Sequence, residues 1–360
     1  MKEFIIEENE AGQRFDKYLA KLLKEAPVSF FYKMLRKKNI TLNGKKATGK
    51  EKLLKGDTVK LFLSDETYEK FSGDTYVARA YAHLDVIYED EDILIINKPQ
   101  GMLSQPDKDG QPSLVEYVTG YLLKSGALDE KQLNTFKPSV CNRLDRNTSG
   151  MVCAGKSLPG LQFLSQLFHD RTIHKYYLCL VKGVIKEEQK ISGFLSKDPL
   201  GNKVTVTMEE APDSLPIETA YQPVCTNGRV TLLSVRLITG RSHQIRAHLA
   251  GIGHPLAGDR KYGDQSFNRQ FEKYGLKNQL LHGYKIVFPR IGGSFERMSG
   301  RSFVAPVPEL FQEIIRGENL EEKYYEFLER NMGICKACHS CGSDYSHHKS
   351  CGADKCKNTF

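Results

Sequence analysis

The chain has 360 residues, of which 40% are hydrophobic and 27% are charged, and this length allows two or three domains. The composition excludes a disordered chain, and no apolar run approaches the roughly 18 residues of a membrane helix. The formal net charge of +8 is concentrated, since residues 1–64 hold 15 Lys and Arg against 8 Asp and Glu, a net charge of +7. Such a basic segment favours a nucleic-acid partner, although a solubilising surface would carry the same charge.

The basic segment is predicted to form two short helices, a hairpin and a final strand. Apolar residues recur at helical spacing within residues 15–23 and again within residues 31–35. The dipeptide Asn43-Gly44 is a strong hairpin signal, and alternating apolar residues at 59–63 predict the final strand. The basic residues that we expect on the polar sides of these elements are Arg14, Lys17, Arg36, Lys37 and Lys38.

The same segment resembles the small αL RNA-binding domain named after ribosomal protein S4. The resemblance rests on three short matches, R-F-D-K-Y-L at 14–19, L-N-G-K at 42–45 and K-G-D-T-V at 55–59. It implies that residues 1–64 bind RNA and contact phosphates through the five basic residues above. The sequence departs from that family at the start of the second helix, where Phe30 and Phe31 follow Ser29 instead of an arginine.

The rest of the chain is predicted to contain a linker and an α+β region. Residues 65–80 are polar and contain Gly73, which is typical of a linker. The predicted strands cover residues 83–99, 174–183, 218–225 and 229–240, and the predicted helices cover residues 113–126 and 159–171. Strand and helix do not alternate regularly, so an α+β fold is favoured over a doubly wound one.

One stretch matches the phosphate-binding pattern of nucleotide triphosphatases. Gly150 to Ser157 reads G-M-V-C-A-G-K-S. The pattern works only when an apolar strand precedes it and a loop surrounds the phosphate. Here polar residues precede it, and the four residues between the glycines are apolar and strand-like. The sequence therefore argues against a nucleotide triphosphatase.

Asp145 lies between Arg143 and Arg146 in a polar stretch that runs directly into an apolar one. A guanidinium beside a carboxylate favours its ionised form, which is able to act as a nucleophile. A structural salt bridge uses the same residue types, and spacing alone favours that simpler interpretation.

A second basic stretch, T-G-R-S-H-Q-I-R, covers residues 239–246. We expect Ser242 to cap a helix on which Arg246 occupies an exposed face. From that face Arg246 can form a bidentate pair with a carboxylate elsewhere in the chain. The buried stripe of this helix is predicted to be Ile245, Leu249 and Ile252.

These segments resemble the RluA-type pseudouridine synthases, whose signature is an R-L-D-x-x-T-S-G loop. The matches follow the family's order over about residues 83–320: N-K-P-x-G at 97–101, R-L-D-x-x-T-S-G at 143–150, K-x-Y at 175–177, T-G-R-S-H-Q-I-R at 239–246, G-H-P-L-A-G-D at 253–259 and L-L-H at 280–282. The resemblance implies a pseudouridine-synthase fold in residues 81–330, with a central mixed, largely antiparallel sheet flanked by helices.

The resemblance also implies residue roles and a reaction without cofactor or metal. Asp145 matches the catalytic aspartate that attacks the target uridine, Tyr177 the tyrosine that stacks on the base, and Arg246 the arginine that pairs with the aspartate. Asn142 stands where many family members have histidine. The expected pocket residues are Arg143, Leu144 and Leu280 or Leu281, and the expected RNA contacts of this region are Arg146, Arg241 and His243.

The nine cysteines fall into two groups. Cys141, Cys153, Cys179 and Cys225 are scattered through apolar or mixed contexts and are predicted to be reduced core residues. The other five lie in a Cys-rich tail, residues 331–360, for which a structural zinc knuckle and a flexible segment are equally good interpretations. The candidate zinc ligands are Cys335, Cys338, Cys351 and Cys356.

The leading hypothesis is an RNA pseudouridine synthase, with large-subunit ribosomal RNA as the first expected substrate and transfer RNA as the second. The alternatives are a non-catalytic RNA-binding or ribosome-assembly protein on the same fold, a nucleotide triphosphatase, and a zinc-dependent RNA-processing module. The first residues, MKEFIIEENE, lack the features of a secretory signal. We expect a cytoplasmic monomer with no membrane partner.

Overall fold

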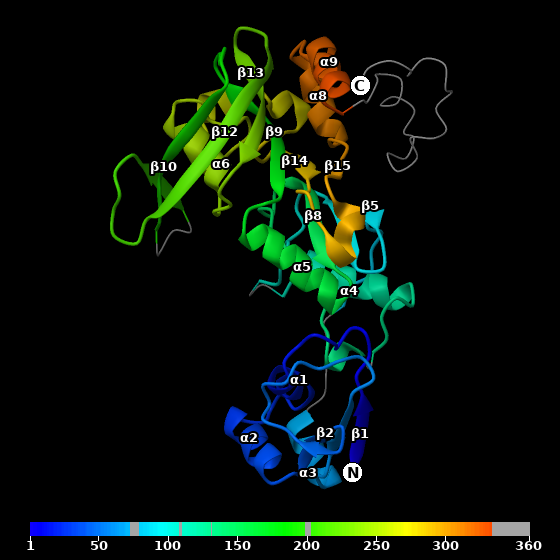
Figure 1. Ribbon diagram of the computed structural model, residues 1–360. Coiled ribbons are helices and arrows are strands. Elements are labelled where there is room, and N and C mark those ends of the chain that lie inside the picture. The colour runs from blue at the N-terminus through cyan, green and yellow to red at the C-terminus, as the bar shows by residue number, and fades with distance from the viewer. Residues whose placement is uncertain (73–78, 108–109, 131, 199–202, 333–360) are drawn as a thin grey trace, which may run out of the picture.

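The computed structural model describes residues 1–72, 79–107, 110–130, 132–198 and 203–332. Two sheets lie at opposite ends of the molecule (Figure 1). One belongs to residues 1–72, called the N-terminal module below, and the other belongs to the body, which begins at residue 79. Thr135 Oγ1 of the body donates a hydrogen bond to Glu10 Oε1 of the module, and both residues are buried at this junction.

Three helices and a four-stranded antiparallel sheet, with the strand order β1-β4-β2-β3, surround the apolar core of the N-terminal module. Asn43 and Gly44 have φ angles of +50° and +71°, the left-handed values that the predicted hairpin turn requires. The two predicted helices, the hairpin and the final strand are confirmed. The elements are β1 (Lys2–Ile5), α1 (Phe15–Leu22), α2 (Val28–Arg36), β2 (Ile40–Leu42), β3 (Lys45–Lys46), β4 (Thr58–Leu61) and α3 (Asp65–Ser72).

Helix α3 occupies the start of the segment that the sequence predicted to be a linker. The ring centroid of Phe71 lies 4.6 Å from that of Phe30, and Tyr68 stacks on Phe4 at 6.3 Å. Phe30 follows Ser29 at the point where the resemblance led us to expect an arginine, and it packs against α3. The polar composition of α3 concealed this contact, because two aromatic rings make its main apolar contacts with the module.

The body contains an eleven-stranded sheet with the order β11-β10-β12-β13-β9-β14-β8-β6-β5, to which β15 adds at β14 and β7 at β8. Among the described residues only β14 and β8 pair in parallel, so the predicted mixed, largely antiparallel sheet is confirmed. The strands are β5 (Val86–Glu89), β6 (Ile93–Lys98), β7 (Ser139–Val140), β8 (Ser149–Gly155), β9 (His174–Lys182), β10 (Gln189–Lys197), β11 (Val204–Thr207), β12 (Leu215–Thr226), β13 (Val230–Leu237), β14 (Leu281–Val287) and β15 (Ser302–Val304).

Helices cover this sheet, and the two predicted at residues 113–126 and 159–171 are present. Ser113 and Glu116 form a capping box at the start of α4, and Ser157 caps α5. Helices α4 and α5 lie at the end of the body nearer the module, and α8 and α9 lie at the far end (Figure 1). The helices are α4 (Leu114–Lys124), α5 (Leu158–His169), α6 (Gln244–Gly251), α7 (Gln265–Arg269), α8 (Glu309–Gly317) and α9 (Glu321–Met332).

Helix α6 differs from its prediction in three ways. It begins after His243, whose φ of +55° is left-handed, and no side chain caps it, so Ser242 is not the cap. Ile252 ends the helix and is 38% exposed, although the other two residues of the predicted stripe are buried. Arg246 is buried rather than exposed, because α6 packs against β11 and β12.

Strand β8 contains most of Gly150 to Ser157, the stretch that matches the phosphate-binding pattern of nucleotide triphosphatases. All of Ser149–Gly155 is buried in the sheet, so the stretch is a strand, as predicted, and not a phosphate-binding loop. The four cysteines predicted to be reduced are free thiols. Over the part of the chain that the structure describes, no helix is long and apolar enough to cross a membrane.

The parallel pairing of β8 with β14 depends on two glycines. A Cβ atom on Gly150 would lie 2.4 Å from the backbone nitrogen and oxygen of Gly283, which is closer than atoms can approach. Gly150 also has a φ of +121°, a value that other residues rarely adopt. The glycine that ends the R-L-D-x-x-T-S-G match is therefore needed to bring β14 against the strand that follows Asp145.

Candidate active site

Asp145 lies on the loop between β7 and β8, and hydrogen bonds fix the backbone on both sides of it. The N–H of Thr148 donates to the carbonyl oxygen of Asp145 at 3.0 Å and closes a turn. Ser104 Oγ donates to the carbonyl oxygen of Leu144 at 2.8 Å and accepts from the N–H of Leu144 at 3.0 Å. The carboxylate of Asp145 therefore projects from an ordered loop.

Asn142 anchors the same loop to β8. Its Nδ2 donates to the carbonyl oxygen of Met151 at 3.1 Å, and its Oδ1 accepts from the N–H of Cys153 at 2.8 Å. Both ends of the amide thus have partners within the strand. Asparagine therefore keeps the loop attached at the position where the resemblance led us to expect histidine.

Arg246 reaches the loop from α6 and contacts two carboxylates. Its Nε and Nη2 donate to Oδ2 and Oδ1 of Asp259 at 2.7 and 3.0 Å, and the side chain of Asp259 is fully buried. Its Nη1 donates to Oδ2 of Asp145 at 3.0 Å. The structure thus brings Arg246 to Asp145, but the bidentate partner is Asp259. Sequence reasoning did not single out Asp259, although it is the last residue of the G-H-P-L-A-G-D match.

The charges of Arg246 and Asp259 balance each other. Burial disfavours the charge of Arg246, but hydrogen bonds and attraction from Asp259, followed by Asp145, outweigh burial and raise the pKa of Arg246. Burial also disfavours the charge of Asp259, and the hydrogen bonds from Arg246 and two backbone N–H groups outweigh it and lower the pKa of Asp259. Arg246 therefore needs no further counter-charge, which weakens the interpretation of Asp145 as a structural partner.

The side chain of Asp145 is 24% exposed and has one unused oxygen. Its Oδ2 accepts the hydrogen bond from Arg246, while among the described residues Oδ1 has no hydrogen-bond donor. A carboxylate that is oriented by a buried guanidinium, and that keeps one oxygen free, can attack a bound molecule.

The two arginines that flank Asp145 in the sequence have other partners. Arg143 Nη1 donates to Gln105 Oε1 at 3.4 Å, and Arg146 Nη2 donates to Gln111 Oε1 at 2.7 Å. The cation that contacts Asp145 comes from α6, about a hundred residues away in the sequence. The expectation that Arg143 and Arg146 keep the Asp145 carboxylate ionised is therefore wrong, because Arg246 is the arginine that contacts it.

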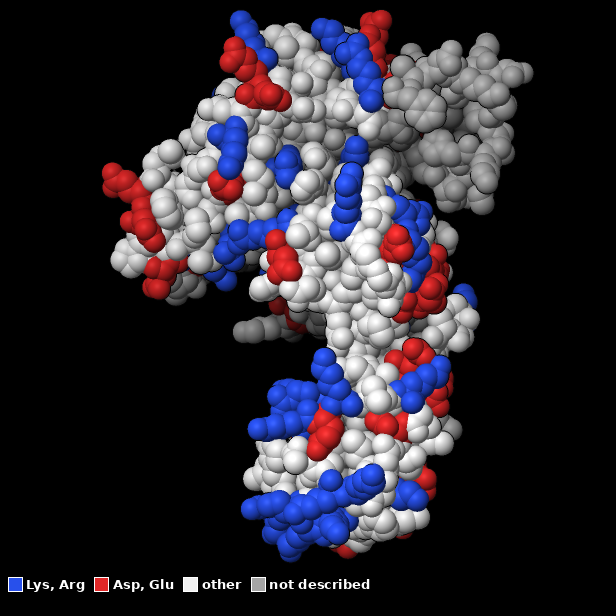
Figure 2. Space-filling model, viewed as in Figure 1, with Lys and Arg blue, Asp and Glu red and all other residues white. Residues whose placement is uncertain are grey.

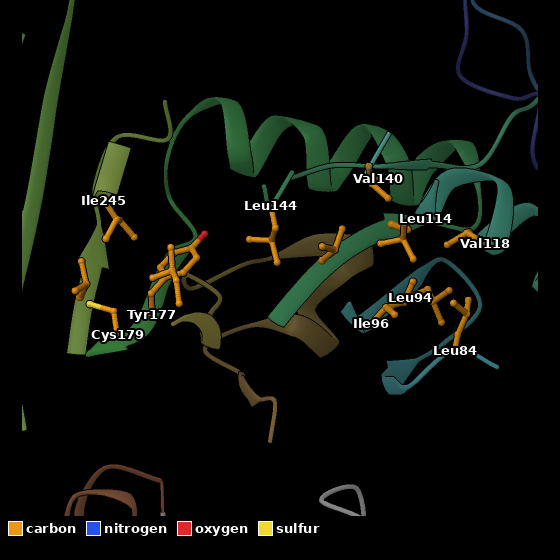
Figure 3. Close-up of a cluster of buried hydrophobic side chains, with 14 of the residues drawn as sticks. Leu84, Leu94, Ile96, Leu114, Val118, Val140, Leu144, Tyr177, Cys179 and Ile245 are labelled. Carbon is orange, nitrogen blue, oxygen red and sulfur yellow. The ribbon is translucent and has the colours of Figure 1, made fainter. Parts of the chain in front are cut away.

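Tyr177 projects from β9 into the same region and is 6% exposed. Burial, and then the charge of Asp145, raise the pKa of the Tyr177 hydroxyl above its usual range, so the hydroxyl is protonated at neutral pH. Leu281 lines the space beside Tyr177 and Asp145, whereas Leu280 packs in a different apolar cluster. Figure 3 shows Tyr177 at one end of the core, near Leu144. Of the two leucine candidates, Leu281 is the one at the site.

Lys98, the lysine of the N-K-P-x-G match, is fully buried behind the loop. Its Nζ donates to the carbonyl oxygens of Pro99, Met102 and Arg146 at 2.9, 2.8 and 3.2 Å. Burial lowers the pKa of Lys98 to about 7, and attraction to Asp145 opposes this shift. Lys98 joins the two loops at the site, a role that the sequence motif did not reveal.

His243 approaches Asp145 from the start of α6. Its Nδ1 lies 2.9 Å from the hydroxyl of Tyr262, and its Nε2 lies 4.0 Å from Oδ2 of Asp145. Burial lowers the pKa of His243, and the charge of Asp145 opposes this shift. The backbone of His243 is left-handed, and its ring lies at the site directly before α6 begins.

A cavity of about 950 Å³ opens at Asp145, between the loop after β7, the end of α5, β9 and the segment after β13. This volume lies at the upper end of the roughly 300–1,000 Å³ that small-molecule sites occupy. The catalytic, pocket and RNA-contact residues predicted from the sequence that line it are Arg143, Leu144, Asp145, Arg146, Tyr177, Arg241 and His243. Arg246 and Leu281 line an adjoining pocket that shares Asp145 and Tyr177.

The five basic residues singled out in the N-terminal module are all exposed. Lys and Arg side chains cover much of the module on the face seen in Figure 2. Arg14 is already paired with Asp16 at 2.6 Å, and Asp16 also accepts a hydrogen bond from Tyr32. The other four, Lys17, Arg36, Lys37 and Lys38, have no ion-pair partner among the described residues.

The four candidate zinc ligands, Cys335, Cys338, Cys351 and Cys356, lie outside the described residues. Within the described ranges no three His, Cys, Asp or Glu side chains gather in a way that would hold a metal ion. The groups at the site are the carboxylates of Asp145 and Asp259, the guanidinium of Arg246 between them, the phenol of Tyr177 and the apolar side chain of Leu281.

Two family models match the chain. The model described as RNA pseudouridylate synthase matches residues 92–251, and the S4 domain matches residues 13–59. The ribosomal large subunit pseudouridine synthase C of Vibrio vulnificus is 33% identical over 293 residues, which are 79% of this chain and 87% of the relative. An uncharacterized RNA pseudouridine synthase of Mycoplasma genitalium is 32% identical over 294 residues, 80% of this chain and 89% of the relative.

A solved structure shares the fold of the body. Human RNA pseudouridylate synthase domain containing 4 aligns with a TM-score of 0.53 at 19% identity, over 65% of this chain and 92% of that one. This likeness supports the α+β architecture of the body.

Proposed function

The chain belongs to the RNA pseudouridylate synthase family, and on that premise we propose that Asp145 is its nucleophile and that its substrate is large-subunit ribosomal RNA. The enzyme isomerises specific uridines to pseudouridines. The substrate proposal is supported by the names of the relatives, several of which are ribosomal large subunit pseudouridine synthases.

The observation that carries the proposal is the arrangement of charges at Asp145. Arg246 is neutralised by the buried Asp259 and yet donates to Oδ2 of Asp145 at 3.0 Å. Asp145 is therefore oriented by a guanidinium that does not depend on it, and its other oxygen remains available in the cavity. A salt bridge formed only for stability requires neither a guanidinium that is already neutralised nor a carboxylate oxygen that stays free.

The reaction balances without a cofactor. Asp145 attacks C1′ of the target uridine as the bond between C1′ and N1 breaks, and the released uracil rotates in the cavity. C5 then bonds to C1′ as the bond between C1′ and the Asp145 carboxylate breaks. C5 loses its proton, and N1 gains a proton. The residues are therefore required to orient the carboxylate, hold the detached base and move one proton.

Tyr177 and Leu281 are proposed to hold the base. A paired uridine must leave its helix before a carboxylate can reach its glycosidic bond, at a cost of a few kcal/mol. Stacking on an aromatic ring recovers about 1–3 kcal/mol per base. Tyr177 supplies the ring, and Leu281 supplies an apolar wall beside it.

The exposed cations of the N-terminal module, together with Arg146, Arg241 and His243, are proposed to bind the RNA backbone. One chain supplies Asp145, Arg246 and the other groups at the site, which supports a monomeric enzyme.

Release of the C5 hydrogen gives a direct test. Transcripts of large-subunit ribosomal RNA and of transfer RNA, each labelled with tritium at C5 of uridine, are incubated with the purified chain and with Asp145→Asn. We expect tritium release from the ribosomal transcript with the unsubstituted chain only. Release with both proteins would exclude Asp145 as the nucleophile, and release from transfer RNA alone would replace the proposed substrate.

The second candidate is a non-catalytic RNA-binding protein on the same fold. The basic surface of the module supports RNA binding but does not require the charge arrangement at Asp145. This candidate predicts tight binding of the ribosomal transcript without tritium release from any RNA.

A further inference from the structure

The part of the cavity beyond Asp145 contains basic groups that the proposed chemistry does not use. Lys175 lines the cavity two residues before Tyr177 on β9, and Arg171 lines it after the end of α5. Arg241 lines the same wall from the segment after β13. In all, five arginine and lysine side chains line this cavity, against Asp107 and Asp145.

Two of these cations lack acceptors within the protein. Among the described residues, Nζ of Lys175 has neither a hydrogen-bond acceptor nor a carboxylate at ion-pair distance, and the nearest aromatic ring is Phe168, 5.9 Å from Nζ to the ring centroid. The Nε of Arg241 is buried and has no hydrogen-bond partner. A buried donor without a partner destabilises the free protein, so the Nε of Arg241, with the unpaired and partly exposed amine of Lys175 on the same wall, points to a missing anion.

The backbone makes room for the Lys175 amine. An ideal Cβ on Gly240 would lie 3.3 Å from Nζ of Lys175, which is tighter than most such contacts, and apart from the neighbours of Gly240 in the chain no other atom of the described residues lies within 4 Å. Burial, and then repulsion from Arg171, lower the pKa of Lys175. The protein therefore holds this amine where burial and Arg171 disfavour its charge, without a carboxylate to offset them.

We propose that Lys175, with Arg241 and Arg171, forms a subsite for a backbone phosphate of the RNA strand next to the target uridine. Residues two apart on a strand lie about 6.6 Å apart on the same face, so Lys175 is within one nucleotide of Tyr177. With the target base at Tyr177, the adjoining phosphate lies toward Lys175 and receives its ammonium group together with the Arg241 Nε. The inference deepens the proposed function and rests on it.

The test compares Lys175→Met with Lys186→Met in the full-length chain. Methionine keeps the length of the lysine stem, and Lys186 is an exposed lysine beyond the other end of β9, so both variants lose one charge. The probe is a short fluorescein-labelled single-stranded oligouridine, whose binding is measured by anisotropy from about 50 to 200 mM KCl. Tritium release from ribosomal RNA supplies kcat and KM.

We expect Lys175→Met to weaken oligouridine binding about tenfold and to reduce the slope of log affinity against log salt by about 1. KM should rise by a similar factor, while kcat changes by less than about threefold. Lys186→Met should match the unsubstituted chain. Gly240→Ala, which displaces the Lys175 amine without removing it, should weaken binding in the same direction.

Thermal melting distinguishes a ligand-binding cation from a structural one. Lys175→Met should melt at the same temperature as the unsubstituted chain or higher, because it removes a partly buried charge that has no partner in the free protein. Binding and salt slope equal to those of Lys186→Met, or a lower melting temperature with unchanged binding, would overturn the subsite. If no tritium is released by the unsubstituted chain but Lys175→Met still reduces the salt slope, the subsite stands and the proposed reaction fails.

Discussion

Replacing Asp259 with asparagine tests how Arg246 is oriented. Asp259 has no exposed side-chain surface and accepts two hydrogen bonds from Arg246. Its Oδ1 also accepts from the N–H groups of Lys261 and Tyr262 at 2.8 and 3.0 Å. Asparagine can retain the backbone bonds through its one oxygen, but its amide nitrogen then faces the guanidinium. Arg246 would be left with Asp145 as its only carboxylate.

The expected effects follow from burial. Removing one partner of a buried ion pair costs about 3–5 kcal/mol, and the retained backbone bonds place Asp259→Asn near the lower value. The guanidinium then moves toward Asp145 and shifts the carboxylate, and a displacement of about 1 Å costs roughly a hundredfold in rate. We therefore expect a loss of about 3 kcal/mol in the free energy of unfolding and a fall of roughly a hundredfold in kcat.

Urea unfolding followed by circular dichroism measures the first quantity, since the chain has no tryptophan for fluorescence. Tritium release measured below the unfolding transition gives the second. Asp213→Asn is the matched control, because Asp213 is exposed and its φ of +61° suits asparagine. Wild-type kcat in Asp259→Asn would refute the reasoning, since Arg246 would then be oriented by something other than Asp259.

Three further results are expected. Urea unfolding at several pH values should show that the unsubstituted chain gains stability relative to Lys98→Met as the pH rises from 7 toward 10.5. In this range Lys98 keeps its proton in the unfolded chain but has lost it in the folded chain. A fall in relative stability would contradict the buried position of Lys98. Gly150→Ala should lower the free energy of unfolding by roughly 3 kcal/mol through overpacking and backbone strain. The control Gly228→Ala, whose Cβ would meet nothing within 4 Å, should lower it by about 1 kcal/mol through strain alone. Equal losses would contradict the close contact of Gly150 with Gly283. A chain ending at Met332 should release tritium at the rate of the full chain; loss of release in the truncated chain, together with a loss in the full chain on chelation that added zinc reverses, would favour the zinc-dependent alternative.

Local patterns predicted much of the fold. Helical spacing located α1, α2, α4 and α5, and the Asn43-Gly44 turn located the β2–β3 hairpin, because these signals depend on residues close in sequence. The helix α3 was missed because its composition is polar and its contacts come from two aromatic rings. The prediction that Arg246 is exposed failed because strands distant in sequence cover α6.

The residue types of the site could be predicted, and the resemblance also gave the contact of Arg246 with Asp145, but the remaining partners could not be predicted. The motifs pointed to Asp145, Tyr177 and Arg246, yet the pairing of Arg246 with Asp259 and the burial of Lys98 arise only when distant loops meet. The sequence order even suggested the wrong cations for Asp145, since neighbours along the chain point to other partners. Hydrogen-bond partners across a fold have no signal in local spacing.

The most direct test of the central claim is pseudouridine mapping of total RNA from cells in which the gene is deleted and then restored. One strain receives the unsubstituted gene and another receives Asp145→Asn at the same protein level. The account predicts that pseudouridines at one or a few positions of large-subunit ribosomal RNA vanish on deletion, return with the unsubstituted gene and stay absent with Asp145→Asn. Return of the modification with Asp145→Asn would contradict the assignment of Asp145 as nucleophile.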